Sequence, residues 1–191
     1  MLPGQSAKRR VIRGRLPVPT ALAIARQVAE ALATLHAGGF IHGDVKADNI
    51  RLVSTSRAVL VDLGFAHRPG EHPGATGAAL MMGTPNYMAP ELCQPPVTDT
   101  PAADIFALGV TLYLLLTGLL PYPEGATKDV VRRRRTDDPA DLNRVRGEWV
   151  NGLPELLRSM TDPDPTARPR AKQLVHKLIA LQILTMRKRA G

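Results

Sequence analysis

Acidic, basic and amide side chains cluster in one short stretch of this 191-residue sequence, in a pattern that suits chemistry on phosphate groups. The stretch is His42–Asn49, and Asp62–Gly64 follows it, with Asp62 thirteen residues after Asn49. Magnesium prefers oxygen ligands in octahedral geometry and keeps phosphates and waters in the rest of its shell. Asn49 and Asp62 can supply the protein oxygens, so the pattern indicates Mg²⁺-assisted phosphoryl transfer.

Two charged residues of the same stretch fit further roles in such a transfer. Asp44 can face an incoming hydroxyl and act as its base or orient it. Lys46, two residues on, can neutralise charge on the transferred phosphoryl group. Either residue alone would be read as an ordinary surface polar residue, so the assignment depends on the sequence that flanks them.

Four sequence blocks in this order resemble eukaryotic-type serine/threonine protein kinases of bacteria. The first block is similar to the family's catalytic loop, H-R-D-L-x-x-x-N, together with its metal loop, D-F-G. A second block is similar to the end of a kinase activation segment, and two distal blocks complete the series: Gly83–Glu91, Asp104–Gly109 and Asp162–Pro169. One block alone would be a weak signal, but four in the correct order and spacing argue strongly against coincidence.

The resemblance implies a kinase that uses ATP and Mg²⁺ to phosphorylate serine or threonine hydroxyls of a protein substrate. The residues that it assigns are catalytic Asp44, Lys46 and Thr84, cofactor-binding Lys46, Asn49, Arg51 and Asp62, and metal-binding Asn49 and Asp62. It also implies that Thr84 hydrogen-bonds Asp44 and Lys46, and that Glu91 and Arg168 form a buried ion pair between the activation segment and the distal helices.

Three positions depart from the family pattern. Arg51 stands where the family has an apolar residue of the adenine floor, and an arginine stem can still lie flat under a ring. Gly43 replaces the arginine that usually pairs with activation-segment phosphate, which suggests that phosphorylation is not required to order the segment. Leu63 replaces phenylalanine in the metal loop. Both residues are apolar, and apolar sites usually tolerate a substitution of this size.

The predicted fold is mainly α, a kinase-like C-terminal lobe with a small β-hairpin by the catalytic loop. Apolar residues recur at helical spacing from Ala21 to Leu35, with Thr20 as an expected N-cap and glycines after the helix as a stop. Two short apolar runs, Ile50–Val53 and Ala58–Val61, predict the hairpin.

Two further features complete the predicted fold. The run Ile105–Leu120 is apolar on every side, which is typical of a buried central helix, and it falls short of the roughly 20 residues of a membrane span. Six leucines indicate two distal helices: Leu153, Leu156, Leu157, Leu174, Leu178 and Leu181. We expect one partial kinase domain over 1–191, with a hinge-proximal segment 1–19, a catalytic core 20–120 and distal helices 121–186.

Neither G-x-G-x-x-G nor a V-A-I-K-like strand lysine precedes the catalytic loop. The resemblance therefore covers only the larger lobe of the family, and we expect the N-terminal β lobe to be absent and the chain to be a truncated catalytic lobe. Such a lobe would need a covering N-lobe or a partner chain. It would leave apolar surface bare around Val45, Ile50, Leu52 and Leu63.

Two other functions compete with a protein kinase. A truncated lobe can act as a non-catalytic, pseudokinase-like binding or scaffold module. A small-molecule kinase of similar fold is the weaker alternative, because Glu91 after Ala89 and Pro90 belongs to a segment that such enzymes generally lack.

The composition of the chain argues against several other classes of protein. The formal net charge is +8, but aromatic residues make up 4% and no nucleic-acid motif is present, so we expect a solvated basic surface and no nucleic-acid partner. Cys93 is the single cysteine, which excludes an intramolecular disulfide and a zinc cluster of cysteines. The first residues lack the apolar region of a signal peptide, so we expect a cytoplasmic protein without a membrane span.

Overall fold

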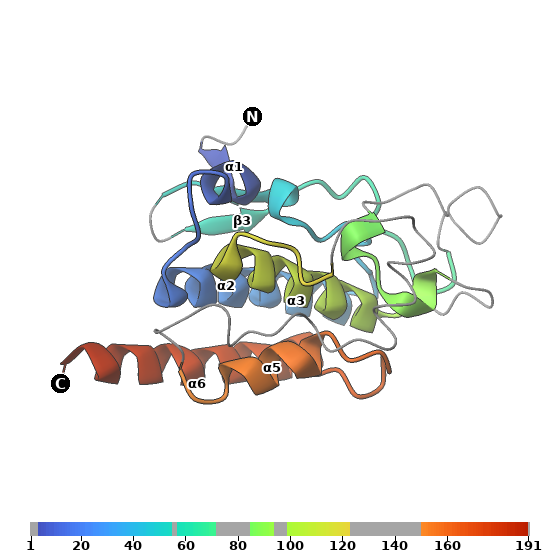
Figure 1. Ribbon diagram of the computed structural model, residues 1–191. Coiled ribbons are helices and arrows are strands. Elements are labelled where there is room, and N and C mark those ends of the chain that lie inside the picture. The colour runs from blue at the N-terminus through green and yellow to red at the C-terminus, as the bar shows by residue number, and fades with distance from the viewer. Residues whose placement is uncertain (1–3, 55–56, 72–84, 94–98, 123–149, 191) are drawn as a thin grey trace.

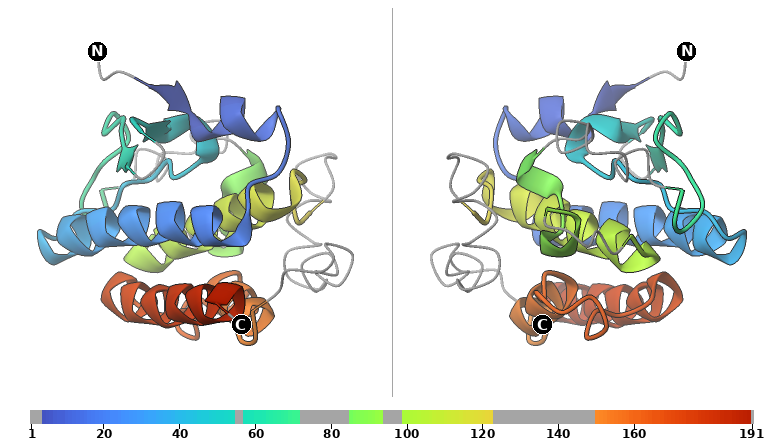
Figure 2. Two further views of the ribbon diagram at one scale, coloured as in Figure 1. Left: turned by 90° about the vertical axis from the view of Figure 1, so that its left-hand side faces the viewer. Right: turned by 90° about the vertical axis from the view of Figure 1, so that its right-hand side faces the viewer.

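Helices and a small sheet are stacked in three layers in the computed structural model, which describes residues 4–54, 57–71, 85–93, 99–122 and 150–190. Figure 1 shows the sheet and α1 above α2 and α3, with α5 and α6 below, and the side views of Figure 2 agree. The helices are α1 (Ala7–Val11), α2 (Val18–Ala37), α3 (Pro101–Thr117), α5 (Leu153–Met160) and α6 (Ala171–Ala190). Three 3-10 turns are η1 (Ala47–Asn49), η3 (Pro85–Tyr87) and η4 (Pro90–Leu92).

The sheet is antiparallel and has the order β1 (Gln5–Ser6), β2 (Ile50–Leu52), β3 (Ala58–Leu60). Pairing of Ile50 with Leu60 confirms the predicted hairpin. The sequence analysis missed β1, which pairs Gln5 with Leu52. Two residues are too few to show the alternation by which a strand is recognised.

Helix α2 begins three residues earlier than predicted. Pro17 is its N-cap and Pro19 lies in the first turn, so the assignment of Thr20 as N-cap was wrong. Proline is tolerated there because the first N–H groups of a helix have no partner inside the helix. The helix ends at Ala37, and the glycine stop is confirmed, since Gly39 adopts a φ of 79°.

Helix α3 forms the centre of the core, as its apolar sequence predicted. Every residue from Ala103 to Leu116 is buried. Gly118 ends the helix with a left-handed φ of 78°, so the predicted end at Leu120 was too late and Leu119 is 68% exposed. Among the described residues no helix is long and apolar enough to cross a membrane.

The lower helices are held by apolar contacts with α2 and α3. All six predicted leucines are buried, three in α5 and three in α6, and α6 packs along α2. Gly109 lets α3 approach the end of α5 closely. A Cβ at this position would lie 2.8 Å from Thr161 Cγ2 and 2.9 Å from Met160 Cβ, closer than real contacts allow.

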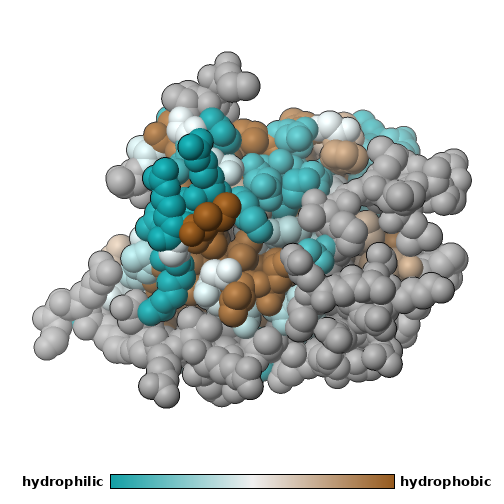
Figure 3. All heavy atoms as spheres, turned by 45° about the horizontal axis from the view of Figure 1, so that its top comes forward, coloured by the Kyte–Doolittle hydropathy of each residue, from teal (hydrophilic) through white to brown (hydrophobic). Residues whose placement is uncertain are grey.

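The predicted bare surface around the catalytic loop is only partly present. Val45 is 1% exposed and Ile50 is fully buried, so the prediction was wrong for both, because α1 packs over η1 and β2. Leu52 is half-buried against the core, whereas Leu63 is 61% exposed, as predicted. Figure 3, in which the top of the molecule is tilted toward the viewer, shows hydrophobic residues near the middle of the face, with hydrophilic ones to their left and above them.

The predicted ion pair between Glu91 and Arg168 is confirmed. Arg168 Nη1 lies 2.6 Å from Glu91 Oε1 and Nη2 lies 2.8 Å from Oε2, and the arginine side chain is fully buried. The other three N–H groups donate to the backbone carbonyls of Asp162, Ala102 and Pro163. All five guanidinium donors are therefore satisfied, which is the condition for burying this charge.

Replacing Arg168 with alanine is expected to lower the free energy of unfolding by about 3–5 kcal/mol, because the Glu91 carboxylate loses its countercharge. Arg168→Lys should recover little of this loss, since an ammonium cannot reproduce the bidentate fork. Urea denaturation followed by circular dichroism measures both effects.

Arg170→Ala is the matched control, because Arg170 lies two residues away and is exposed. We expect it to change the stability by less than about 0.5 kcal/mol. Equal denaturation midpoints for Arg168→Ala and Arg170→Ala would contradict a structural role for the pair.

Candidate active site

One buried carboxylate fixes the backbone of the catalytic loop. The backbone N–H of His42 donates to Asp104 Oδ2 at 2.8 Å, and that of Gly43 donates to Oδ1 at 3.0 Å. His36 Nε2, at the end of α2, also lies 2.8 Å from Oδ2. Asp104 is 2% exposed, so these polar contacts offset the loss of water around its charge.

Sequence reasoning missed this role of Asp104, although the residue opens one of the four family blocks. The available signal was a single carboxylate inside an otherwise apolar helix. A charge in such a place needs hydrogen-bond donors from elsewhere in the chain, and here they come from a loop 62 residues away in sequence.

The structure brings Asp44, Lys46 and Asn49 together. Lys46 Nζ lies 2.7 Å from Asp44 Oδ2, and Asn49 Nδ2 donates to the same oxygen at 2.8 Å and to the Asp44 backbone carbonyl at 2.9 Å. Asp44 is 6% exposed and Asn49 is 8% exposed. Both side-chain contacts go to Oδ2, so they leave Oδ1 for a hydroxyl donor.

Asp62 is joined to this group through the backbone of its neighbour. The N–H of Val61 donates to the Asn49 carbonyl at 2.9 Å, which brings the metal loop to the end of the catalytic loop. Asp62 has a φ of 71°, a left-handed conformation that is strained for residues other than glycine, and its Oδ1 accepts the Gly64 N–H at 3.2 Å. Strain of this kind concentrates at functional sites.

The donor set of Asn49 and Asp62 fits Mg²⁺. The amide nitrogen of Asn49 is used as a donor to Asp44, so its amide oxygen is the group left for a cation. The Asp62 side chain is exposed and offers carboxylate oxygen. Two hard oxygen ligands suit a metal that completes its shell with phosphates and waters.

The other two predicted site residues lie outside this group. Arg51 is in β2 between Ser6 and Val59 of the neighbouring strands, and its Nη2 donates to the carbonyl of Gly4. Its side chain is therefore hydrogen-bonded to the first described residue of the chain. Thr84 falls outside the described residues.

Comparison with known proteins assigns the class of this chain. Residues 2–179 match the protein kinase domain family, and the chain belongs to that family. Its relatives include two serine/threonine-protein kinases of Streptomyces coelicolor, PkaA and PkaB, at 34% and 35% identity over 83% and 86% of this chain. Serine/threonine-protein kinase PknD of Mycobacterium tuberculosis is 38% identical over 81% of it.

The match covers a minority of each relative. The aligned regions span 29% of PkaA, 40% of PkaB and 23% of PknD. The predicted membership of the eukaryotic-type serine/threonine kinase family is confirmed, and the chain belongs to an enzyme family.

Removing the Asp104 carboxylate is expected to free the catalytic loop. A hydrogen bond to a charged group contributes about 1.5–3 kcal/mol, so in Asp104→Ala the His42 and Gly43 amides should exchange with solvent deuterium roughly tenfold faster or more. NMR-detected exchange measures this rate. Asp48→Ala, an exposed acid of the same loop, is the control, and equal rates in the two variants would argue against the anchoring role.

Proposed function

We propose that these residues transfer the terminal phosphoryl group of Mg²⁺-ATP to serine and threonine hydroxyls of protein substrates. The observation that carries the proposal is the Asp44 carboxylate. One of its oxygens is held by Lys46 and Asn49 on a loop that Asp104 anchors, and the other is left for a hydroxyl. Phosphoryl transfer depends mainly on such positioning and on electrostatics.

Each side chain has a distinct task in the proposed mechanism. Asp44 orients the substrate hydroxyl and accepts its proton as the oxygen attacks. Lys46, at 2.7 Å from Asp44, offsets the negative charge of the carboxylate and of the phosphoryl group. Asn49 and Asp62 would hold the metal, which when bound would neutralise negative charge on the phosphates.

The described residues would supply the lower half of the nucleotide site, corresponding to the C-terminal lobe of the family. Arg51, on β2, would lie under the adenine, and Thr84 would hydrogen-bond Asp44 and Lys46. A covering N-lobe or a partner chain would close the site from above. Leu63 supports a covering partner, because this large apolar side chain of the metal loop is 61% exposed.

Exposure of Leu63 also favours the second candidate, a non-catalytic module that binds another chain through this face. The two functions differ in one measurable respect. A binding module has no use for the carboxylates of Asp44 and Asp62, so its variants should bind as the parent does and no form should transfer phosphate.

With a nucleotide-covering lobe from a kinase relative joined to this chain, Asp44→Asn and Asp62→Asn should each lower the phosphotransfer rate on the order of 10²–10⁴-fold. The reason is loss of the base in one variant and of a metal ligand in the other. Transfer of labelled phosphate to serine and threonine peptides measures the rate. Asp48→Asn is the control on the same loop, and full activity of Asp62→Asn would remove the metal assignment.

The 191-residue chain by itself is expected to bind Mg²⁺-ATP weakly, since its sequence contains no G-x-G-x-x-G loop and no V-A-I-K-like strand lysine. A dissociation constant at or above about 1 mM would stabilise the chain by at most about 0.4 kcal/mol at 1 mM nucleotide. The melting temperature should then rise by no more than about 1–2 °C. A larger, Mg²⁺-dependent rise in a thermal-shift experiment would show that these residues suffice for tight binding.

A further inference from the structure

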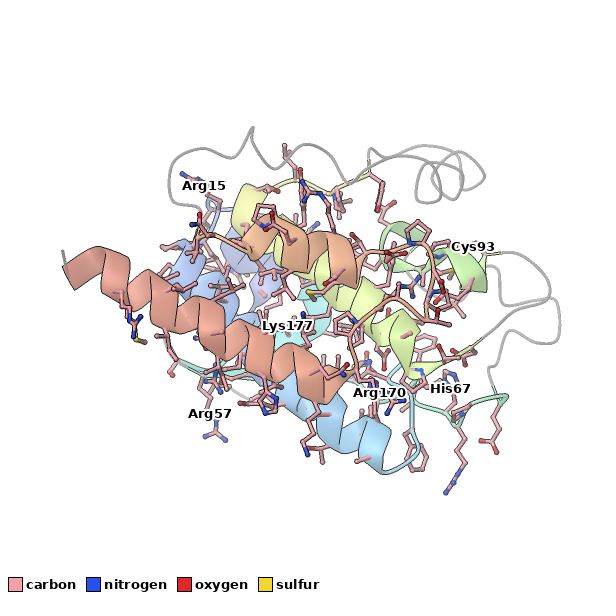
Figure 4. All side chains as sticks on the ribbon, turned by 90° about the horizontal axis from the view of Figure 1, so that it is seen from below. Arg15, Arg57, His67, Cys93, Arg170 and Lys177 are labelled. Atoms are coloured by element: carbon pink, nitrogen blue, oxygen red, sulfur yellow. The ribbon has the colours of Figure 1, made fainter. Side chains whose placement is uncertain are left out.

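His67, five residues after Asp62, is hydrogen-bonded to the backbone of Ile41, which directly precedes the catalytic loop. Its carbonyl accepts the Ile41 N–H at 2.8 Å and its own N–H donates to the Ile41 carbonyl at 3.1 Å, which makes an isolated antiparallel bridge. Figure 4 shows His67 beside the N-terminal end of α3. The residue is 8% exposed, so it is part of the interior.

Both nitrogens of the His67 ring face groups that can only accept hydrogen bonds. Nδ1 lies 2.7 Å from the backbone carbonyl oxygen of Phe65, and Nε2 makes a close contact with Asp99 Oδ2. A carbonyl has no proton to donate, and neither has an ionised carboxylate. With an ionised carboxylate, this geometry is satisfied by a proton on each ring nitrogen, which makes His67 a cation paired with the Asp99 anion.

The electrostatic surroundings act in the same direction. Burial by itself lowers the pKa of His67, but the Phe65 carbonyl and the carboxylates of Asp99 and Asp104 outweigh it, so the pKa is raised. Asp99 lies just ahead of α3 and Asp104 lies inside α3. The neighbouring cation in sequence, Arg68, lies over the ring of Phe40.

Gly43 makes the space in which this arrangement fits. It has a φ of 78°, and a Cβ at this position would lie 2.8 Å from the Phe65 carbonyl oxygen and 3.3 Å from His67 Cε1. A side chain at position 43 would therefore start inside the volume that His67 and Phe65 occupy. The position of the His67 ring therefore requires a residue without a side chain at position 43.

We infer that the His67–Asp99 ion pair, seated over Gly43, is a positioning device that ties the start of the activation segment to the catalytic loop and to α3. Both partners are side chains of this chain, so the tie forms without phosphorylation. The pair holds Ile41, which precedes the catalytic loop, in register with the residues after Asp62. A role of this ion pair in catalysis depends on the proposed function. The existence of the ion pair as a structural link does not depend on it.

The tie depends on pH because the histidine must be charged. The pKa of His67 is raised in the folded chain above its ordinary value of about 6.5. The stabilisation is therefore fully present below about pH 6.5 and is lost as the pH rises through the folded pKa. A rise in pH should loosen the bridge between Ile41 and His67.

Two measurements on the full 191-residue chain test the inference without nucleotide, so their outcome is independent of whether the chain transfers phosphate. In the first, NMR follows the Cε1 protons of the histidines from pH 5 to 9. His67 should titrate above the ordinary histidine value of about 6.5. Titration of His67 at or below this value would overturn the ion pair.

In the second, deuterium exchange of the Ile41 and His67 amides is corrected for the intrinsic pH dependence of exchange. Protection should fall between pH 6 and pH 9 in the parent, because the charge of His67 is lost as the pH rises through its raised pKa. Asp99→Asn should remove this dependence and show low protection throughout, while His176→Gln, a change at an exposed histidine of α6, should behave as the parent. The same pH dependence in Asp99→Asn as in the parent would refute the tie, and if this variant fails to fold, the parent titration decides.

Discussion

The arrangement of the site depends on the burial of one negative charge at the start of the central helix. Asp104 is 2% exposed, and it is stable there because two backbone N–H groups of the catalytic loop and the His36 ring surround it. Supplying both of these amides restricts the conformation of the loop. That conformation directs Asp44 and Asn49 to each other. Helix α3, buried along its length, provides the rigid support that a positioned base requires.

Two further ion pairs hold the residues that follow the metal loop, and they differ in kind. Arg168 carries a permanent charge and uses all five of its donors. His67 carries a charge that can be lost, so we infer that its contact with Asp99 responds to pH. The η4 turn, which contains Glu91, is therefore held by a permanent cation, and the residues after Asp62 are held by a titratable one.

Periodicity predicted the main helices and the hairpin, because these are properties of neighbouring residues. The site residues came from local spacing and from the family resemblance, and their roles stay predictions. The contacts of Asp104 and of His67 could not be predicted, since each joins segments that only the folded chain brings together. The burial of Val45 and Ile50 was missed for a related reason. Helix α1 covers them, and a five-residue helix gives no signal about what it packs against.

Paramagnetic broadening by Mn²⁺-ATP tests the central claim most directly, because it detects weak binding and locates the metal. Added at millimolar concentration to the 15N-labelled chain, Mn²⁺-ATP should selectively broaden the amide resonances of Asn49 and Asp62 and their neighbours. Asp62→Asn should abolish this broadening. Broadening confined to the exposed acidic turn at Asp162 and Asp164, or persisting unchanged in Asp62→Asn, would contradict the account.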